Sequence, residues 1–321
     1  MNQKLALSEP LYPSVQPFAW EIELFSSKPL RRLKQLAHFG GGSFVSPVVH
    51  SRFEHTVGVW KLTALFFPED VELRVAALLH DVGHLPFSHA VEDTLGFNHH
   101  QLTEQYILED EISTILAKAN IKPKQIIKLL NEPTSITGKD TILGIDHLDS
   151  FLRDTYMSGN IEFLPAEVLA KLTCGPAGIE TDRETGNYLM KLIKDDHRLF
   201  LSPFMVAVDR LLAEAIKEHW QTNAMNKSDF ARLIDADVIW MLQHSSSSKA
   251  KELINTILYQ PERISVQEAN HGKGYPINIR KIYSKVPLCD GKPLTEQSNE
   301  ARKILEEMAS LAFDLEVVVE H

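Results

Sequence analysis

Apolar residues recur at steps of three and four along most of the first 245 residues, which predicts a mainly helical body. Two predicted helices cover residues 53–67, which Pro68 ends, and residues 69–82, which Gly83 and Pro86 end. Further helices are predicted over residues 29–36, 99–116, 123–130, 140–157, 187–200, 203–220 and 228–241.

The pattern changes after residue 245. Residues 263–267 and 277–286 alternate between apolar and polar side chains, and residues 313–319 are rich in valine, so all three segments are predicted strands. A helix is predicted over residues 299–309. We therefore predict a mainly α fold with an N-terminal arm (1–20), a helical body (21–245) and a small α+β C-terminal region (246–321).

Composition narrows the class of protein. The chain has 321 residues, 44% of them hydrophobic, which is enough for a substantial core, and its formal net charge is −10. A surface of that sign repels phosphate backbones, so no duplex nucleic-acid partner is expected. Cys174 and Cys289 are far apart in the chain, which indicates neither a disulfide framework nor a thiolate zinc site and favours a cytoplasmic setting. No segment is apolar enough to predict a membrane partner.

Candidate chemistry centres on the adjacent pair His80-Asp81 at the end of a predicted helix. His55 lies three residues after Arg52, so both share one helical face, and Asp146 comes from a distant helix. Two imidazoles and two carboxylates suit one divalent ion, with Mn²⁺, Fe²⁺ or Zn²⁺ favoured and Co²⁺ or Mg²⁺ possible. Such an ion can polarise a phosphate and activate water. A lone His-Asp pair is more often a salt bridge at a helix end, but the four-residue set favours the metal.

Several motifs in a fixed order accompany this set. They are Leu33-Lys34-Gln35-Leu36, Gly40-Gly41-Gly42, Arg52-Phe53-Glu54-His55, the block from His80 to His89, Asp146 with Phe151-Leu152-Arg153-Asp154, residues 233–237 and residues 280–283. In these residues the chain resembles the HD superfamily of metal-dependent phosphohydrolases, in its deoxynucleoside triphosphate triphosphohydrolase branch. The resemblance implies an HD-domain helical bundle and a homo-oligomer.

The resemblance also implies roles for individual residues. The metal ligands would be His55, His80, Asp81 and Asp146. The catalytic residues would be His84, His89, Glu92 and His99. The substrate contacts would be Gln35, Leu36, Arg52, His147 and Asp154, with Arg52 on a phosphate and Asp154 on the sugar.

The chain departs from the family pattern at several places. His100 stands where the family has a glutamate after its catalytic histidine, and His147 and Ser150 replace a lysine and a stacking tyrosine. The family's later Arg and Tyr-x-His pattern is not recognisable between Leu189 and Pro203. The metal chemistry therefore transfers better than the triphosphate and deoxyribose specificity.

The sequence thus predicts a metal-dependent phosphohydrolase of nucleotides, foremost a deoxynucleoside triphosphate triphosphohydrolase that releases triphosphate. The alternatives are a nucleotide phosphomonoesterase, a guanosine-nucleotide hydrolase, or a nucleotide-binding regulatory protein without turnover, which the missing carboxylate at His100 motivates. Gly40-Gly41-Gly42 is more typical of a turn than of a phosphate-binding loop, because no Lys-Ser/Thr pair follows it.

Overall fold

The computed structural model describes residues 9–47, 49–223, 225–269, 274–279 and 282–320. In the first half of the chain the helices are α2 (Ala19–Ser26), α3 (Lys28–Arg32), η1 (Leu33–Gln35), η2 (Gly40–Phe44), α4 (Arg52–Phe66), α5 (Val71–Leu79), η3 (Ser88–Val91), α6 (Glu92–Leu95), α7 (His99–Leu108), α8 (Asp110–Lys118), α9 (Pro123–Asn131) and α10 (Ile145–Met157). In the second half they are α11 (Pro165–Leu169), α12 (Arg183–Phe200), α13 (Pro203–Thr222), α14 (Lys227–Phe230), α15 (Asp235–Gln243), α16 (Ser248–Tyr259), η4 (Pro261–Arg263), α17 (Leu294–Gln297) and α18 (Asn299–Ala309). The predicted mainly α fold is confirmed.

Two small sheets join segments that are distant in the chain. In one sheet, of order β1-β2-β5-β6, the strands are β1 (Thr173–Gly175), β2 (Gly178–Glu180), β5 (Leu288–Cys289) and β6 (Lys292–Pro293). In the other, of order β3-β7-β4, the strands are β3 (Ile264–Glu268), β7 (Asp314–Val319) and β4 (Tyr275–Asn278). The second sheet is wholly antiparallel, with Val317 of the central strand opposite Val266 and Tyr275. The C-terminal residues therefore pair with one another and, through β5, with the helical part.

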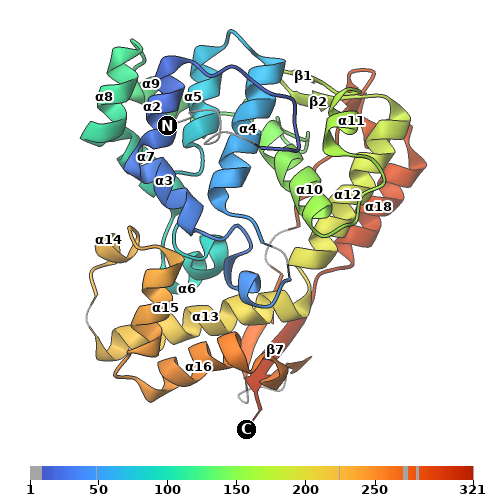
Figure 1. Ribbon diagram of the computed structural model, residues 1–321. Coiled ribbons are helices and arrows are strands. Elements are labelled where there is room, and N and C mark those ends of the chain that lie inside the picture. Colours follow the sequence, from blue (N-terminus) through green and yellow to red (C-terminus); the bar gives the residue numbers. More distant parts are fainter. Residues whose placement is uncertain (1–8, 48, 224, 270–273, 280–281, 321) are drawn as a thin grey trace.

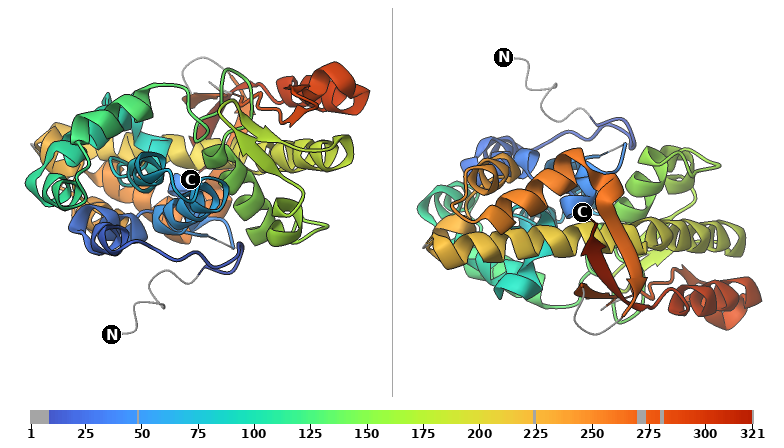
Figure 2. Two further views of the ribbon diagram at one scale, coloured as in Figure 1. Left: turned by 90° about the horizontal axis from the view of Figure 1, so that it is seen from above. Right: turned by 90° about the horizontal axis from the view of Figure 1, so that it is seen from below.

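The buried apolar residues form two clusters, one around α4, α5, α10 and α12 and one around α13, α16 and the β3-β7-β4 sheet. Figure 1 shows the first group of helices above the long α13, with α16 and β7 below it, and Figure 2 shows α12 and α18 side by side at one edge. Helix α4 is buried along nearly its whole length, because other elements surround it. The predicted division after residue 245 stays a prediction.

The structure corrects four predicted boundaries. Helix α5 ends at Leu79, so His80 and Asp81 follow it in a turn instead of lying in its last turn; there the amide of Val82 bonds to the carbonyl of Leu79 at 3.2 Å. The helix predicted over 99–116 breaks at Glu109, whose backbone is extended and separates α7 from α8.

The helix predicted over 228–241 is two helices, α14 and α15. Arg32 keeps the intervening backbone out of a helix, since its guanidinium binds the carbonyls of Ala231, Arg232 and Leu233. The strand predicted over 277–286 ends at Asn278, and Val286 makes only an isolated bridge with Ile142.

The N-terminal arm packs on the body. Of the predicted arm, residues 1–8 lie outside the described residues, and α2 already begins at Ala19. The buried carboxylate of Glu9 lies 3.2 Å from Arg153 Nη1 and 3.5 Å from Lys61 Nζ. The glycine triplet forms η2 against α13, where Asp209 Oδ1 accepts the amide of Gly41 at 2.8 Å, which confirms a turn. Within the described residues, no helix has the length and apolar character that crossing a bilayer requires.

Helix α2 carries a buried and an exposed ion pair two residues apart. The carboxylate of Glu21 accepts hydrogen bonds from Arg74 at 2.7 Å and 2.8 Å and from Trp60 Nε1 at 2.8 Å, and it is fully buried. Glu23 pairs with Lys118 at 2.5 Å on the surface.

We expect Glu21→Leu to lower the free energy of unfolding by about 3–5 kcal/mol, because it leaves the Arg74 charge buried without its partner. The matched change Glu23→Leu removes only an exposed pair and should cost less than about 1 kcal/mol. Urea denaturation of both variants measures the difference. Equal losses for the two variants would contradict this account of the α2 packing.

Candidate metal centre and adjoining histidines

Three segments bring four metal-ligating side chains together. His55 lies in the first turn of α4, His80 and Asp81 directly follow α5, and Asp146 lies in the first turn of α10. His55 Nε2 lies 3.3 Å from His80 Nε2 and 3.0 Å from Asp146 Oδ1. His80 Nε2 lies 3.5 Å from Asp81 Oδ1 and 3.7 Å from Asp146 Oδ1. His55, His80 and Asp146 therefore offer donor atoms within 4.8 Å of one another, and Asp81 lies beside the two imidazoles.

The spacing of these donor atoms fits one ion. Ligands bonded at about 2.0–2.2 Å to one cation lie about 3–3.5 Å from one another. The contacts of the two imidazoles with each other and with Asp81 and Asp146 span 3.0 Å to 3.8 Å. Imidazole nitrogens and carboxylate oxygens together suit Mn²⁺, Fe²⁺ or Zn²⁺. The residues thus fit the divalent ion that the sequence predicts.

Hydrogen bonds on the far side of each imidazole direct its Nε2 inward. His55 Nδ1 lies 2.8 Å from Asp149 Oδ2, and Arg153 in turn donates to that carboxylate at 2.9 Å and 3.0 Å. His80 Nδ1 lies 2.8 Å from the carbonyl of Ala77. Partners of this kind set the tautomer and the orientation of a ligating imidazole.

Asp149 needs a close approach of α4 to α10. A Cβ at Gly58 would lie 1.9 Å from Asp149 Oδ1, so only glycine at this position leaves space for the carboxylate that holds His55. The sequence reasoning assigned no role to Asp149. The signal was its helical spacing, three residues after Asp146 and four before Arg153.

The local charges keep the carboxylates ionised. Burial raises the pKa of Asp146, but the hydrogen bond with His55 and the charges of His147 and His80 lower it to below its usual range. For Asp149, the Arg153 charge and the His55 hydrogen bond overcome burial and lower its pKa to about 2. Ionised carboxylates are the form that binds a cation.

Arg52 joins the metal ligands to the loop after them. Its Nη1 donates to Asp81 Oδ2 at 2.8 Å and its Nε to Ser88 Oγ at 2.8 Å, and the side chain is buried. Helix α4 begins at Arg52 behind a capping pair in which Glu54 accepts from the amide of Ser51 at 2.5 Å. A cation therefore lies beside the metal ligands, as predicted.

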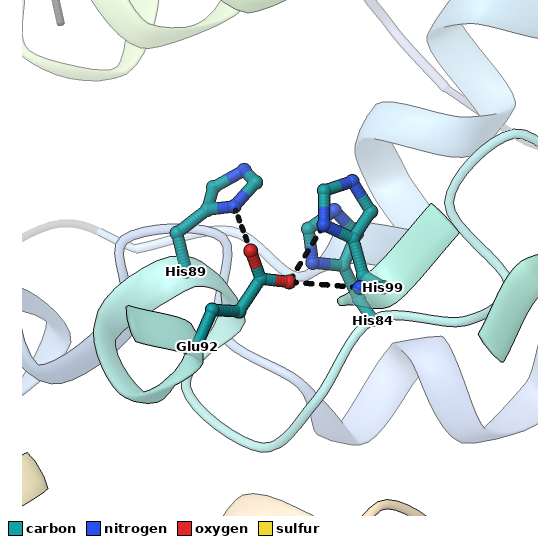
Figure 3. A group of neighbouring side chains, drawn as sticks. All are labelled: His84, His89, Glu92 and His99. Atoms are coloured by element: carbon teal, nitrogen blue, oxygen red, sulfur yellow. Dashed lines mark hydrogen bonds and ion pairs between the residues drawn. The ribbon is translucent and has the colours of Figure 1, made fainter. Parts of the chain in front are cut away.

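The four predicted catalytic residues form a second cluster, shown in Figure 3. Glu92 lies between two imidazoles, with Oε1 2.6 Å from His99 Nδ1 and Oε2 3.4 Å from His89 Nδ1. The rings of His84 and His99 stack with centroids 4.3 Å apart. Glu92 thus supplies a carboxylate partner for His99, although the family's acidic residue after that histidine is His100 here.

The two clusters touch through His84, whose Nε2 lies 3.2 Å from Asp81 Oδ1. His84 is buried, whereas the His89 side chain is 54% exposed. Burial and the Arg52 charge lower the pKa of His84 well below its usual value. The structure therefore offers one buried neutral imidazole and one accessible imidazole beside the metal ligands.

Gly83 holds the loop between the clusters against α7. A Cβ there would lie 2.2 Å from the amide nitrogen of Thr103 and 2.5 Å from the carbonyl oxygen of His99, so only glycine permits this packing. Its amide donates to Thr103 Oγ1 at 3.1 Å. Further along the loop, Phe87 and Ser88 have positive φ angles of 60° and 55°.

Asp235 in the first turn of α15 holds this loop from the other side, and sequence reasoning gave it no role. Its carboxylate accepts the amide of Phe87 at 2.8 Å and that of Ala37 at 2.7 Å. Arg32 adds a hydrogen bond to the carbonyl of His84 at 2.8 Å. The motif at residues 233–237 was visible in the sequence, but only coordinates show which amides it meets.

The remaining predicted substrate contacts lie in different surroundings. Leu36 is fully buried in the first apolar cluster, and Gln35 is exposed. The His147 ring lies 4.9 Å from the Tyr283 ring, beside Asp146. Asp154 is buried next to His38 and His50 and away from the exposed surface. Of the motif at residues 280–283, residues 280 and 281 lie outside the described residues.

Comparisons with known proteins agree with this geometry. Residues 52–146 match the model of the HD domain. An uncharacterized protein of Mycoplasma pneumoniae is 30% identical over 188 residues, which cover 49% of this chain and 44% of that protein. The uncharacterized protein YdhJ of Bacillus subtilis is 28% identical over 73% of this chain and 74% of its own length. A Dictyostelium discoideum protein described as a deoxynucleoside triphosphate triphosphohydrolase SAMHD1 homolog is 27% identical over 43% of this chain and 33% of its own.

The chain spans about half the length of several of these relatives. Among solved structures, a phosphohydrolase from Bacteroides thetaiotaomicron has a TM-score of 0.71 at 17% identity and covers 98% of this chain and 99% of its own. That likeness shows a shared fold. The matched segment begins at Arg52 and ends at Asp146, so it contains all four predicted metal ligands. Residues 52–146 therefore match the HD domain, and the chain as a whole shares the fold of a protein described as a phosphohydrolase.

Proposed function

We propose that this protein is a metal-dependent phosphohydrolase of nucleotides, with deoxynucleoside triphosphates as its preferred substrates. The observation that carries the proposal is the contact of 3.2 Å between His84 and Asp81, which puts a histidine and carboxylate cluster directly beside a metal-ligating set. Such a pair of clusters can bind a phosphate and move a proton at the same place.

The residues of the first cluster bind the ion and the phosphate. In this proposal His55, His80, Asp81 and Asp146 hold one divalent ion, with Mn²⁺, Fe²⁺ or Zn²⁺ favoured. When bound, the ion polarises a phosphate oxygen and lowers the pKa of water. Arg52, 2.8 Å from Asp81, contributes a fixed positive charge for the phosphate oxygens.

The residues of the second cluster move the proton. His89 directs Nδ1 toward Glu92, so when its ring is protonated the Nε2–H is left to donate to the leaving oxygen of a substrate at the surface. Glu92 fixes His89 and His99 together through its two oxygens. His84, buried between the clusters, keeps its neutral imidazole against Asp81.

The substrate class is supported by the resemblance and by a relative. The ordered motifs resemble the triphosphohydrolase branch, and the Dictyostelium relative is described by that activity. By the same resemblance we propose that Gln35 and Leu36 line the sugar pocket, that His147 contacts the substrate in place of the family's lysine, and that the protein is a homo-oligomer. The two cysteines are free, which supports a reducing, cytoplasmic setting.

The purified chain, loaded with Mn²⁺ and given a panel of nucleoside tri-, di- and monophosphates, should hydrolyse deoxynucleoside triphosphates fastest. Chromatography should then resolve nucleoside and inorganic triphosphate as products. Release of inorganic phosphate from monophosphates alone would favour a phosphomonoesterase. A preference for guanosine nucleotides would favour the guanosine-nucleotide hydrolase. No turnover with any member of the panel would contradict a hydrolase and favour the regulatory alternative.

A pair of neighbouring histidines serves as the control for this panel. His89→Ala should lower kcat by about 10²–10⁴-fold, since it removes the accessible proton donor. His100→Ala changes an exposed histidine beside the cluster and should leave kcat within a few fold. Equal effects of the two changes would show that the second cluster takes no part in the reaction.

Asp149 should govern metal affinity without being a ligand. We expect Asp149→Asn to weaken metal binding by about 10–100-fold, because His55 loses the carboxylate that orients its ring. Competition against a chelator measures the affinity, and Asp195→Asn, a partly exposed position on α12, is the control. An unchanged affinity in a folded Asp149→Asn protein would be inconsistent with this role.

Asp235 should position the loop of the second cluster. Asp235→Ala leaves the Phe87 and Ala37 amides without their acceptor, so we expect faster hydrogen exchange at both amides and a kcat lowered about 10²-fold. Asp237→Ala is the matched change on the same helix, where the carboxylate only caps the amide of Ile234 at 3.1 Å. If both variants exchange and turn over alike, the loop does not depend on Asp235.

A further inference from the structure

A second set of histidines and carboxylates lies buried beside the first. His38 follows η1, His50 precedes α4, Asp154 lies on α10 and Asp196 on α12. The amide of His38 donates to the carbonyl of His50 at 3.0 Å, which fixes the two histidines opposite each other, and their rings stack with centroids 4.6 Å apart. The His38 ring also lies 4.8 Å from that of His55, so this set adjoins the metal ligands.

Five polar atoms of this set lack hydrogen-bond partners within the described chain. The unpartnered atoms are His38 Nδ1, His50 Nδ1 and Nε2, Asp154 Oδ1 and Asp196 Oδ1. The His50 side chain is 4% exposed and that of Asp154 is 2% exposed. Burying so many unpartnered polar atoms is unfavourable, and native proteins pair them with a ligand, an ion or ordered water.

The distances within the set are slightly longer than those around the first metal cluster. Asp154 Oδ1 lies 3.5 Å from His50 Nε2, and Asp154 Oδ2 lies 3.9 Å from His38 Nε2. Both distances are too long for a good hydrogen bond and suit two ligands of one ion. The corresponding contacts of the first cluster span 3.0 Å to 3.8 Å.

The chemistry of the set also suits a cation. Two carboxyl groups share this buried place, and burial and the neighbouring Asp196 raise the pKa of Asp154 well above its usual range. A divalent cation would balance carboxylates here and accept the lone pairs of the imidazoles.

We propose that His38, His50 and Asp154 form a second divalent-cation site, with the Asp196 carboxylate beside it. The donor set of imidazole and carboxylate selects an ion such as Zn²⁺, Mn²⁺ or Fe²⁺. These residues lie outside the segment matched to the HD domain, which spans 52–146. The ion would tie the backbone before α4 to α10 and α12 and neutralise the carboxylates between them.

The inference does not rest on the proposed nucleotide hydrolysis, and metal counting keeps the two apart. The full chain, equilibrated with Mn²⁺ or Zn²⁺ and freed of excess ion, should hold two equivalents by elemental analysis. The His50→Ala protein should hold one equivalent, because the second site is lost. The Asp81→Ala protein should also hold one equivalent, because the first site is lost. His219→Ala removes another buried imidazole, bonded to Ser245 in the second apolar cluster, and should keep two equivalents.

His89→Ala guards against a wrong assignment, since the cluster of His84, His89, Glu92 and His99 could also hold an ion. The His89→Ala protein should keep two equivalents of metal. If His89→Ala instead loses one equivalent and His50→Ala loses none, the proposal is overturned. Where His50→Ala fails to fold by circular dichroism, His38→Ala and an anomalous-scattering map of the wild-type crystal replace it. A map without a peak between His38, His50 and Asp154 would also overturn the proposal.

Soaking the crystal with a non-hydrolysable deoxynucleotide distinguishes the cation site from the alternative that Asp154 binds the sugar of the substrate. A sugar hydroxyl bonded to Asp154, without a second ion, would reassign the cluster to substrate binding and reject the cation site. A second anomalous peak that persists with the nucleotide bound is the result that the proposal predicts.

Discussion

The convergence of two imidazoles and two carboxylates at one point sets the arrangement of the surrounding helices. His55, His80, Asp81 and Asp146 come from three segments, and two carboxylates around the same pair of imidazoles need compensating charge. Part of that charge comes from the protein, since Arg52 donates to Asp81. The rest of the site is built outward from this point, with Asp149 behind His55 and His84 beside Asp81.

A continuous chain of charged contacts runs from the metal ligands to the N-terminal arm. His55 bonds to Asp149, Asp149 to Arg153, and Arg153 lies 3.2 Å from Glu9 of the arm. All four side chains are buried, so each charge is compensated within the chain instead of by water. The arm therefore contributes to the environment of the metal ligands although it supplies none of them.

Much of the fold and of the first cluster could be predicted from the sequence. The spacing of Val71, Val75, Leu78 and Leu79 gives α5, and the His80-Asp81 pair after it marks the site, because helical periodicity and ligand chemistry are both local in sequence. Boundaries were harder. The break before α15 depends on Arg32, which lies about 200 residues away and takes the carbonyls there. No local pattern shows such a contact.

The residues that support the site were the least predictable. Asp149 and Asp235 look like ordinary helix residues until the amides and imidazoles that they meet are known. The pairing of Glu92 with His99 likewise depends on the turn between α6 and α7. The set of His38, His50 and Asp154 has no spacing in the sequence that points to it, because the tertiary fold alone brings these residues together.

The most direct test of the central claim is a crystal structure of the chain with Mn²⁺ at its absorption edge. The account predicts an anomalous peak bonded at about 2.0–2.3 Å to His55 Nε2, His80 Nε2 and one oxygen each of Asp81 and Asp146. A fully loaded crystal with no ion at that point, or with the four side chains turned away from it, would contradict the account.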